Sequence, residues 1–315
     1  MSHPLFTIAI PAFKSSYLGE CIESVLNQSY KDFELLIIDD CSPEDLKSIV
    51  LKYEDARIRY YRNEKGFGAV NVVGNWNKCL EYANGEFIIC IGDDDKLKPC
   101  CLEEYKRLID RYPEKNVFHG WTEIIDEKSN FLEITSIRPE TESVYSMIWH
   151  RWEGRQQFIG DFCFKRAKLI TNGGFYYLPL AWGSDDITSV IAATPNGVAN
   201  TRQLVFQYRK NRFSISTGKE VNIRDKVQAL CLEETWFANY LTGEPEDEID
   251  KLFKMSLVNK LSNHYKKRKI GYITNDISKK VMSITYWLRN SKVYDLDKRD
   301  LIKPLIVGIW NFLRK

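Results

Sequence analysis

Short apolar runs alternate with segments of helical periodicity along the first hundred residues. Apolar runs rich in β-branched residues predict strands, and apolar residues three or four positions apart predict helices between them. Short connections join these elements, and such alternation is typical of an α/β fold with a doubly wound, mostly parallel sheet. The predicted strands are residues 6–10, 34–38, 58–62 and a run that begins at 87, and the predicted helices are 17–26, 42–53 and 69–82.

The pattern changes twice beyond residue 99. A further helix and several strands continue the fold, but residues 135–160 lose periodicity and are interpreted as an irregular insertion that faces the substrate. From about residue 217 the pattern is helical throughout, so we predict a domain of residues 1–217 and a helical region of residues 218–315. The later strands are predicted at residues 116–125, 162–164 and 205–208.

Three adjacent carboxylates, Asp93, Asp94 and Asp95, follow the fourth apolar run. Open α/β sheets bind ligands at the carboxyl ends of their strands. Adjacent like charges repel one another, and a divalent cation that also holds phosphate oxygens relieves this repulsion. The pattern therefore indicates a site for a metal and a diphosphate. The alternative is an acidic turn that caps the helix beginning near Pro99.

Asp39 and Asp40 end the second predicted strand. A carboxylate there can accept hydrogen bonds from a nucleobase or ribose, while the end of the first strand can lie against the base. The alternative, which fits the residues equally well, is that Asp40 caps the turn that follows. The residues at the end of the first strand are Pro11, Ala12 and Phe13.

A loop at residues 180–186 ends in Asp185 and Asp186 and precedes a predicted helix at residues 187–193. A carboxylate across a cleft from a departing diphosphate can take the proton of an incoming hydroxyl, and partial desolvation raises its pKa toward a useful value. The alternative is an acidic N-terminal cap of the helix.

A basic segment follows the last predicted strand. Its cations and hydroxyls can fold over a diphosphate, whereas the alternative is a solvated surface loop. The segment contains Arg209, Lys210, Arg212, Ser214 and Ser216.

Composition narrows the classes of function. The 315-residue chain has a net charge of +2, which gives no reason to expect a nucleic-acid partner. Its eight cysteines form no Cys-x-x-Cys pair and lie mostly in apolar segments, as expected of reduced core residues. The N-terminus lacks a secretory-signal pattern and no apolar window is long enough to span a bilayer, so we expect a cytoplasmic location.

In this order, the motifs resemble those of family-2 glycosyltransferases with the nucleotide-sugar-binding type-A fold. The resemblance covers about residues 5–217, and the ordered combination is more specific than any single piece. The matching segments are residues 6–13, 24–34, 38–42, 83–88 and 93–99, with Tyr208-Arg209 ahead of Ser214-Ile215-Ser216.

The resemblance implies an inverting, metal-dependent transfer of a sugar from a nucleotide diphosphate donor, commonly a UDP-sugar. Asp40 matches the aspartate that binds the base, Asp93 the acid that contacts the ribose or sugar, and Asp94 the ligand of Mn²⁺ or Mg²⁺. Asp185 is the best match for the catalytic base, with Asp186 as its competitor. The residues implied to line the nucleoside pocket are Pro11, Ala12 and Phe13.

The chain departs from the family pattern at several positions. Gly92 stands where an acid is frequent, so the second metal ligand must be Asp93, Asp95, the diphosphate or water. Ser184 stands where the first acid of the usual pair is found. The Gln-x-x-Arg-Trp element of processive synthases is missing, which favours the addition of a single sugar over polymerisation.

The C-terminal region contains a basic run at residues 266–269 and an apolar segment at residues 305–313. The apolar segment is too short to span a membrane, but it can lie in a bilayer interface and bring the protein to a lipid-linked acceptor at the inner face of the cell membrane. The alternative is a helix that packs back on the protein.

The leading interpretation is a bacterial-type glycosyltransferase that adds a sugar to a glycan or lipid-linked acceptor during surface polysaccharide synthesis. An alternative is a nucleotide-sugar or glycan binding protein that has lost catalysis, which Gly92 and Ser184 permit. A dinucleotide-dependent oxidoreductase is disfavoured, because no Gly-x-Gly-x-x-Gly follows the first strand.

Overall fold

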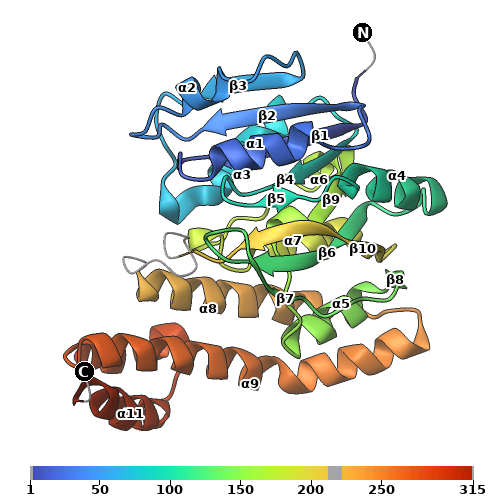
Figure 1. Ribbon diagram of the computed structural model, residues 1–315. Helices are drawn as coiled ribbons and strands as arrows, with labels where there is room; N and C mark the ends of the chain where they lie inside the picture. Colours follow the sequence, from blue (N-terminus) through green and yellow to red (C-terminus); the bar gives the residue numbers. More distant parts are fainter. Residues whose placement is uncertain (1–2, 212–221, 314–315) are drawn as a thin grey trace. The chain divides into compact units, whose positions relative to one another are not determined.

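The computed structural model describes residues 3–211 and 222–313 and divides into two compact units (Figure 1). The first unit contains the chain up to Tyr177 and continues from Ser184. The second contains Leu178–Gly183 and the C-terminal helices.

The first unit is built on a large mixed sheet. Its strands are β1 (Phe6–Ala12), β2 (Phe33–Asp39), β3 (Ile58–Arg62), β4 (Phe87–Cys90), β5 (Lys96–Leu97), β6 (Val117–Ile125), β7 (Phe131–Ile134), β8 (Thr141–Glu142), β9 (Phe162–Lys165) and β10 (Val198–Arg209). Within the described residues the order is β3-β2-β1-β4-β9-β6-β10-β5, with β7 beside β6 and β8 beside β10.

Strands β3, β2, β1 and β4 are mutually parallel, and β6 is parallel to β10. Strand β9 runs antiparallel to both β4 and β6 and so joins the two parallel groups. The carboxyl ends of β1, β2 and β4 therefore meet at one edge of the sheet. This arrangement confirms the predicted α/β class with a mostly parallel sheet.

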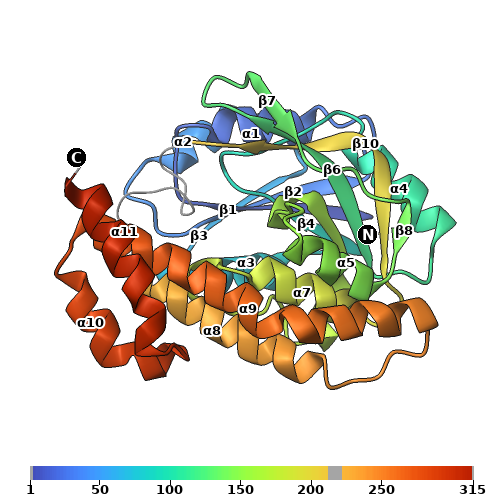
Figure 2. The same ribbon diagram turned by 90° about the horizontal axis from the view of Figure 1, so that it is seen from below.

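Helices cover both faces of this sheet (Figure 2). Helices α1, α2 and α4 share one hydrophobic core with alternate residues of β1, β2 and β4, and α3 packs against the same strands. Because both faces are covered, β2 is buried along its whole length, which is typical of parallel strands. The helices are α1 (Leu18–Leu26), α2 (Leu46–Val50), α3 (Val72–Tyr82), α4 (Cys101–Arg111), α5 (Val144–Trp152), α6 (Arg166–Thr171) and α7 (Ser184–Ala193), with 3₁₀ turns at Ala69–Asn71 and Ile159–Asp161.

Several predicted elements differ from the structure, and β10 begins seven residues before the strand predicted at 205–208. Helix α2 begins four residues later than predicted, because Asp45 rather than Ser42 caps it, with the Asp45 side chain accepting from the Ser48 amide. Residues 135–160 are less irregular than predicted, since they contain β8 and α5. Helix α7 begins at Ser184, so the acids predicted to end a loop lie in its first turn.

The second unit is helical, as predicted for the C-terminal region. Its core is formed mainly by α8, the end of α9 and the segments between α9 and α11. None of the helices in the described ranges is long and apolar enough to cross a membrane. The elements are η3 (Pro179–Ala181), α8 (Ile223–Tyr240), α9 (Glu248–Lys279), α10 (Ser283–Asn290), η4 (Ser291–Tyr294), η5 (Lys298–Leu301) and α11 (Ile302–Leu313).

Gly85 lies immediately before β4, where the backbone approaches the start of β1 closely. A Cβ at this position would lie 2.6 Å from the backbone carbon of Phe6 and would overlap the amide of Thr7. We expect Gly85→Ala to lower the free energy of unfolding by about 1–3 kcal/mol, as overpacking does. Gly271→Ala is the control, since nothing lies within 4 Å of the added Cβ. Equal midpoints of denaturant unfolding for the two variants would contradict this account.

Candidate active site

Asp40 lies just beyond the end of β2 and anchors the loop at residues 63–68. Its Oδ1 accepts hydrogen bonds from Asn63 Nδ2 (3.0 Å) and the Phe67 amide (2.9 Å), and its Oδ2 accepts from the Gly68 amide (3.0 Å). The Asp40 amide donates to the Ala12 carbonyl at 2.9 Å, which fixes it beside the end of β1. A nucleobase bound to Asp40 would therefore share the carboxylate with this loop.

The neighbouring Asp39 is fully buried and has structural partners on three sides. Its carboxylate accepts from the Ser42 amide (2.7 Å), the Tyr60 hydroxyl (2.7 Å) and Arg62 Nη1 (2.5 Å). Burial and the bond to Asp39 raise the pKa of Tyr60 to about 12. The turn after β2 is thus capped by Asp39 and not by Asp40, so Asp40 is the better candidate for contact with a nucleotide.

Asp93 joins the end of β4 to the end of β1. Its Oδ2 accepts hydrogen bonds from the amides of Phe13 and Lys14, each at 2.7 Å. Burial and the charge of Asp94 raise the pKa of Asp93 to about 6. The structure therefore brings together Asp93 and the segment after β1, where the Phe13 ring is 43% exposed and can stack on a planar group.

Asp94 and Asp95 extend from the same turn in different environments. Asp94 Oδ2 accepts from Asn211 Nδ2 at 2.6 Å. Asp95 is buried and its Oδ1 accepts from the Arg209 amide at 2.9 Å, while burial and Asp94 raise its pKa well above the usual range. Asn211, to which no sequence motif assigned a role of its own, therefore lies next to the predicted metal ligand.

Gly92 leaves space for two carboxylate oxygens. A Cβ at this glycine would lie 2.8 Å from Asp94 Oδ1 and 3.0 Å from Asp95 Oδ2, so these oxygens approach a common point. No group of three or more His, Cys, Asp or Glu in the described ranges is arranged to hold a metal. Two carboxylates nevertheless suit Mg²⁺ or Mn²⁺, because such sites are often completed by phosphate oxygens and water.

Arg209 is fully buried and contacts the turn of Asp93, Asp94 and Asp95. Its guanidinium lies 4.2 Å from the centre of the Tyr17 ring, and its Nε donates to the Asp94 carbonyl at 2.8 Å. It also donates to Glu20 Oε2 at 2.9 Å and to Ser129 Oγ at 3.0 Å. These contacts give Arg209 a structural role in place of the exposed position expected for a diphosphate ligand. Of the rest of that predicted segment, Lys210 is exposed, and Arg212, Ser214 and Ser216 lie outside the described residues.

Asp185 and Asp186 lie in the first turn of α7 and differ in their partners. Asp186 Oδ1 accepts from Arg151 Nε and from Gln157 Nε2, each at 2.7 Å. Burial and the adjacent charge of Asp186 raise the pKa of Asp185 to about 8, with Asp161 adding to the shift and Arg151 opposing it. Asp185 therefore has the properties of a proton acceptor, whereas Asp186 is held in an ion pair.

Sequence patterns did not indicate Arg151 or Gln157. Both come from the segment without periodicity, where the packing of α5 against α7 brings Arg151 to Asp186 and Gln157 follows α5. Sequence patterns did not indicate Asp161 either, whose Oδ1 lies 3.1 Å from His119 Nε2. Burial, then Arg138, lowers the pKa of His119 to about 4, so this buried imidazole is neutral at pH 7.

The predicted residues thus form two groups in the first unit. The acids at the ends of β2 and β4 lie beside the end of β1, and the acids of α7 lie against α5. Within the described residues, no hydrogen bond or ion pair links Asp185 with Asp94.

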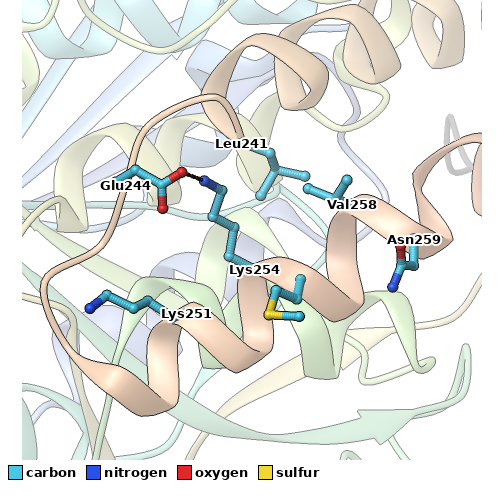
Figure 3. A pocket seen from close by; sticks show the side chains of 7 residues that line it. Leu241, Glu244, Lys251, Lys254, Val258 and Asn259 are labelled. Carbon is cyan, nitrogen blue, oxygen red and sulfur yellow. Dashed lines mark hydrogen bonds and ion pairs between the residues drawn. The ribbon is translucent and has the colours of Figure 1, made fainter.

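A separate pocket lies in the second unit, near the start of α9 (Figure 3). Its volume is about 540 Å³, and its polar side chains include the ion pair of Lys254 with Glu244. It contains none of the predicted site residues. The lining residues are Leu241, Glu244, Lys251, Lys254, Met255, Val258 and Asn259.

The family model of glycosyl transferase family 2 matches residues 7–174 of this chain. A GalNAc(5)-diNAcBac-PP-undecaprenol beta-1,3-glucosyltransferase of Campylobacter jejuni is 39% identical over 97 residues, which are 30% of this chain and 31% of that protein. A putative colanic acid biosynthesis glycosyl transferase of Escherichia coli is 38% identical over 101 residues, 31% of this chain and 35% of that protein. The chain therefore spans about a third of the length of these curated relatives.

Two groups of solved structures share the fold at low sequence identity. Staphylococcus aureus TarS in complex with UDP-GlcNAc superimposes with a TM-score of 0.69 at 17% identity, covering 98% of this chain and 89% of that chain. A mannosyltransferase of Pyrobaculum calidifontis in complex with GDP-Man and Mn²⁺ gives a TM-score of 0.55 at 15% identity, covering 99% of this chain and 88% of that chain.

The burial of Arg209 leads to a test of its structural role. We expect Arg209→Gln to lower the free energy of unfolding by about 3–5 kcal/mol, because removing one partner of a buried charged network leaves the other groups uncompensated. The matched control is Lys210→Gln, an adjacent exposed cation whose removal should cost less than about 0.5 kcal/mol. The measurement is chemical denaturation without nucleotide, and unchanged stability of Arg209→Gln would contradict the structural role.

Proposed function

This chain belongs to glycosyl transferase family 2, and on that premise we propose that it is an inverting enzyme that transfers one sugar from a UDP-sugar to a hydroxyl group. The acceptor is a glycan or a lipid-linked saccharide in the synthesis of a surface polysaccharide. The observation that carries the proposal is the turn of Asp93, Asp94 and Asp95, bonded through Asp93 to the segment after β1.

The donor site is assembled at the carboxyl ends of β1, β2 and β4. Asp40 accepts a hydrogen bond from the base, Phe13 stacks on it with Pro11 and Ala12 beside it, and Asp93 contacts the ribose or sugar. The uridine nucleotide in the TarS structure supports a UDP-sugar, although the mannosyltransferase structure contains GDP-Man. Asp39 and Arg209 act by holding this site in place.

Asp94, with Asp95 as the second carboxylate, would hold Mn²⁺ or Mg²⁺. A bound divalent ion supplies Lewis-acid stabilisation of the negative charge on a departing diphosphate. Asp94 and Asp95 each place one carboxylate oxygen near the same point beside Gly92. The hydrogen bond from Asn211 fixes the orientation of Asp94. The Mn²⁺ in the mannosyltransferase structure supports this choice of ion.

Asp185 takes the proton of the acceptor hydroxyl as that oxygen attacks the anomeric carbon opposite the diphosphate. Attack from the side opposite the leaving group inverts the configuration. The raised pKa of Asp185 makes it a stronger base than an ordinary carboxylate, and the ion pair with Arg151 keeps Asp186 from competing for the proton.

The acceptor proposal draws on the relatives. The printed name of the Campylobacter jejuni relative describes a saccharide on an undecaprenol diphosphate, and the Escherichia coli relative is named for colanic acid synthesis. An acceptor of this kind places the enzyme at the cytoplasmic face of the cell membrane.

The alternative of an inactive binding protein is less well supported. It rested on Gly92 and Ser184, but Gly92 leaves both following carboxylates in place and Ser184 is buried at the start of α7. Neither departure removes Asp94 or Asp185. Hydrolysis of UDP-sugars in the presence of Mn²⁺ would separate an enzyme from a binding protein.

Replacement of the two key carboxylates should have different effects. Asp94→Asn should abolish transfer and the thermal stabilisation produced by UDP-sugar with Mn²⁺. Asp185→Asn should lower kcat by a factor of about 10²–10⁴ but keep that stabilisation, because it removes only the proton acceptor. The control is Asp110→Asn on the exposed side of α4. Turnover of Asp185→Asn at the parent rate would show that another group is the base.

The pH profile should report the ionisation of Asp185. Because the base must be deprotonated, kcat/KM should rise with pH and level off above a midpoint near pH 8. Asp186→Asn removes the neighbouring negative charge, so the pKa of Asp185 should fall and the midpoint should move to lower pH. Profiles measured from pH 5.5 to 9.5 at saturating Mn²⁺ test both statements. A midpoint that Asp186→Asn leaves in place would contradict the assignment.

A further inference from the structure

Helix α11 packs against α9 (Figure 1). Pro304 and Gly308 are its buried residues, and a Cβ at Gly308 would lie 2.5 Å from Cγ2 of Ile277 on α9. Asn311 Nδ2 donates to Ser278 Oγ at 3.4 Å. The backbones of the two helices therefore approach closely, and a narrow face of α11 is used for packing.

The bulky apolar side chains of α11 lie on a different face. Ile302, Ile306, Trp310 and Leu313 are 56%, 63%, 51% and 77% exposed. Their spacing of four, four and three residues places them along one stripe of the helix. A surface helix normally buries such a stripe in its own core, so α11 has the reverse arrangement.

Positive charge predominates on the segments that precede α11 and on the start of α11 itself. Residues 279–303 of the second unit contain seven exposed Lys or Arg side chains but only two exposed carboxylates, Asp295 and Asp297. Of the elements that carry these charges, the end of α9 and η5 contact α11, while Arg289 lies on α10 and Lys292 on η4 (Figure 2). The exposed cations are Lys279, Lys280, Arg289, Lys292, Lys298, Arg299 and Lys303.

We propose that the exposed face of α11 binds the surface of an anionic lipid bilayer, with the helix lying in the plane of the interface. Helix α11 has 12 residues and is about 18 Å long, too short to cross a hydrocarbon core of about 30 Å. An apolar stripe bordered by Lys and Arg is the pattern of helices that lie in the interface.

Charge complementarity favours a lipid surface over a second copy of the chain. Two copies that paired through α11 would bring their surrounding cations together, and such like-charge contact is unfavourable. Anionic headgroups neutralise the same cations while the acyl region accepts the apolar stripe. This inference rests on the proposed function, because membrane binding would serve to bring the donor site to a lipid-linked acceptor.

The test is co-sedimentation of the full chain with vesicles. The parent protein should bind vesicles of phosphatidylcholine with phosphatidylglycerol more tightly than vesicles of phosphatidylcholine alone, and added salt should weaken the binding. The double substitution Ile302→Ser and Ile306→Ser should weaken the binding about tenfold or more, since two apolar side chains no longer enter the interface.

The matched control is the pair Ile249→Ser and Leu252→Ser near the start of α9. These side chains are 64% and 65% exposed, and they lie about 40 Å along α9 from the residues that contact α11. We expect parent-like binding from this control. A separate variant with Lys292→Gln, Lys298→Gln and Arg299→Gln keeps the apolar stripe and should lose most of the preference for anionic vesicles.

Several results would overturn the inference. These are absence of vesicle binding by the parent protein, equal loss of binding in the α9 control, or a dimer in light scattering that only the α11 variant disrupts. Transfer to a soluble acceptor analogue, measured on the same proteins, should be unchanged in the α11 variant. Vesicle binding without any transfer would refute the proposed function alone, and transfer without vesicle binding would refute this inference alone.

Discussion

The site depends on a buried cation, Arg209, that contacts the turn formed by Asp93, Asp94 and Asp95. Adjacent aspartates repel one another, and burial raises this cost. Arg209 offsets part of it by holding the Asp94 carbonyl through its guanidinium and the Asp95 carboxylate through its amide. Its own charge is balanced by Glu20 and its flat face rests on Tyr17. The end of β10 therefore determines where the end of β4 directs its acids.

The carboxylates of this protein divide into those that hold the structure and those that remain available for chemistry. In the pairs at β2 and α7 one buried acid is fixed by an arginine, as Asp39 is by Arg62 and Asp186 is by Arg151. At β2 the fixed acid shapes the turn, and at α7 it raises the pKa of its neighbour, Asp185. At α7 this pairing gives one of two adjacent acids a raised pKa, which is the property required of the proposed proton acceptor.

The second unit shows that amphipathicity alone does not define which side of a helix is buried. In α11 a close backbone approach at Gly308 fixes the packed side, and the larger apolar residues are left outside. The sequence predicted the helix and its apolar character, and it left open whether the helix packs on the protein or binds a membrane. The position of one glycine relative to Ile277 decides which side chains are exposed.

The sequence by itself determined the central parallel strands, the α/β class and the acids at the strand ends, because these depend on local periodicity and on the direction of parallel strands; it did not predict the short strands β5, β7 and β8. Through resemblance it also predicted family roles for Asp94 and Asp185. Only the tertiary structure decided the burial of Arg209 and the ion pair of Asp186 with Arg151. These features join residues that are far apart in sequence, and charge balance in a buried site depends on which side chains meet and not on the order in which they occur.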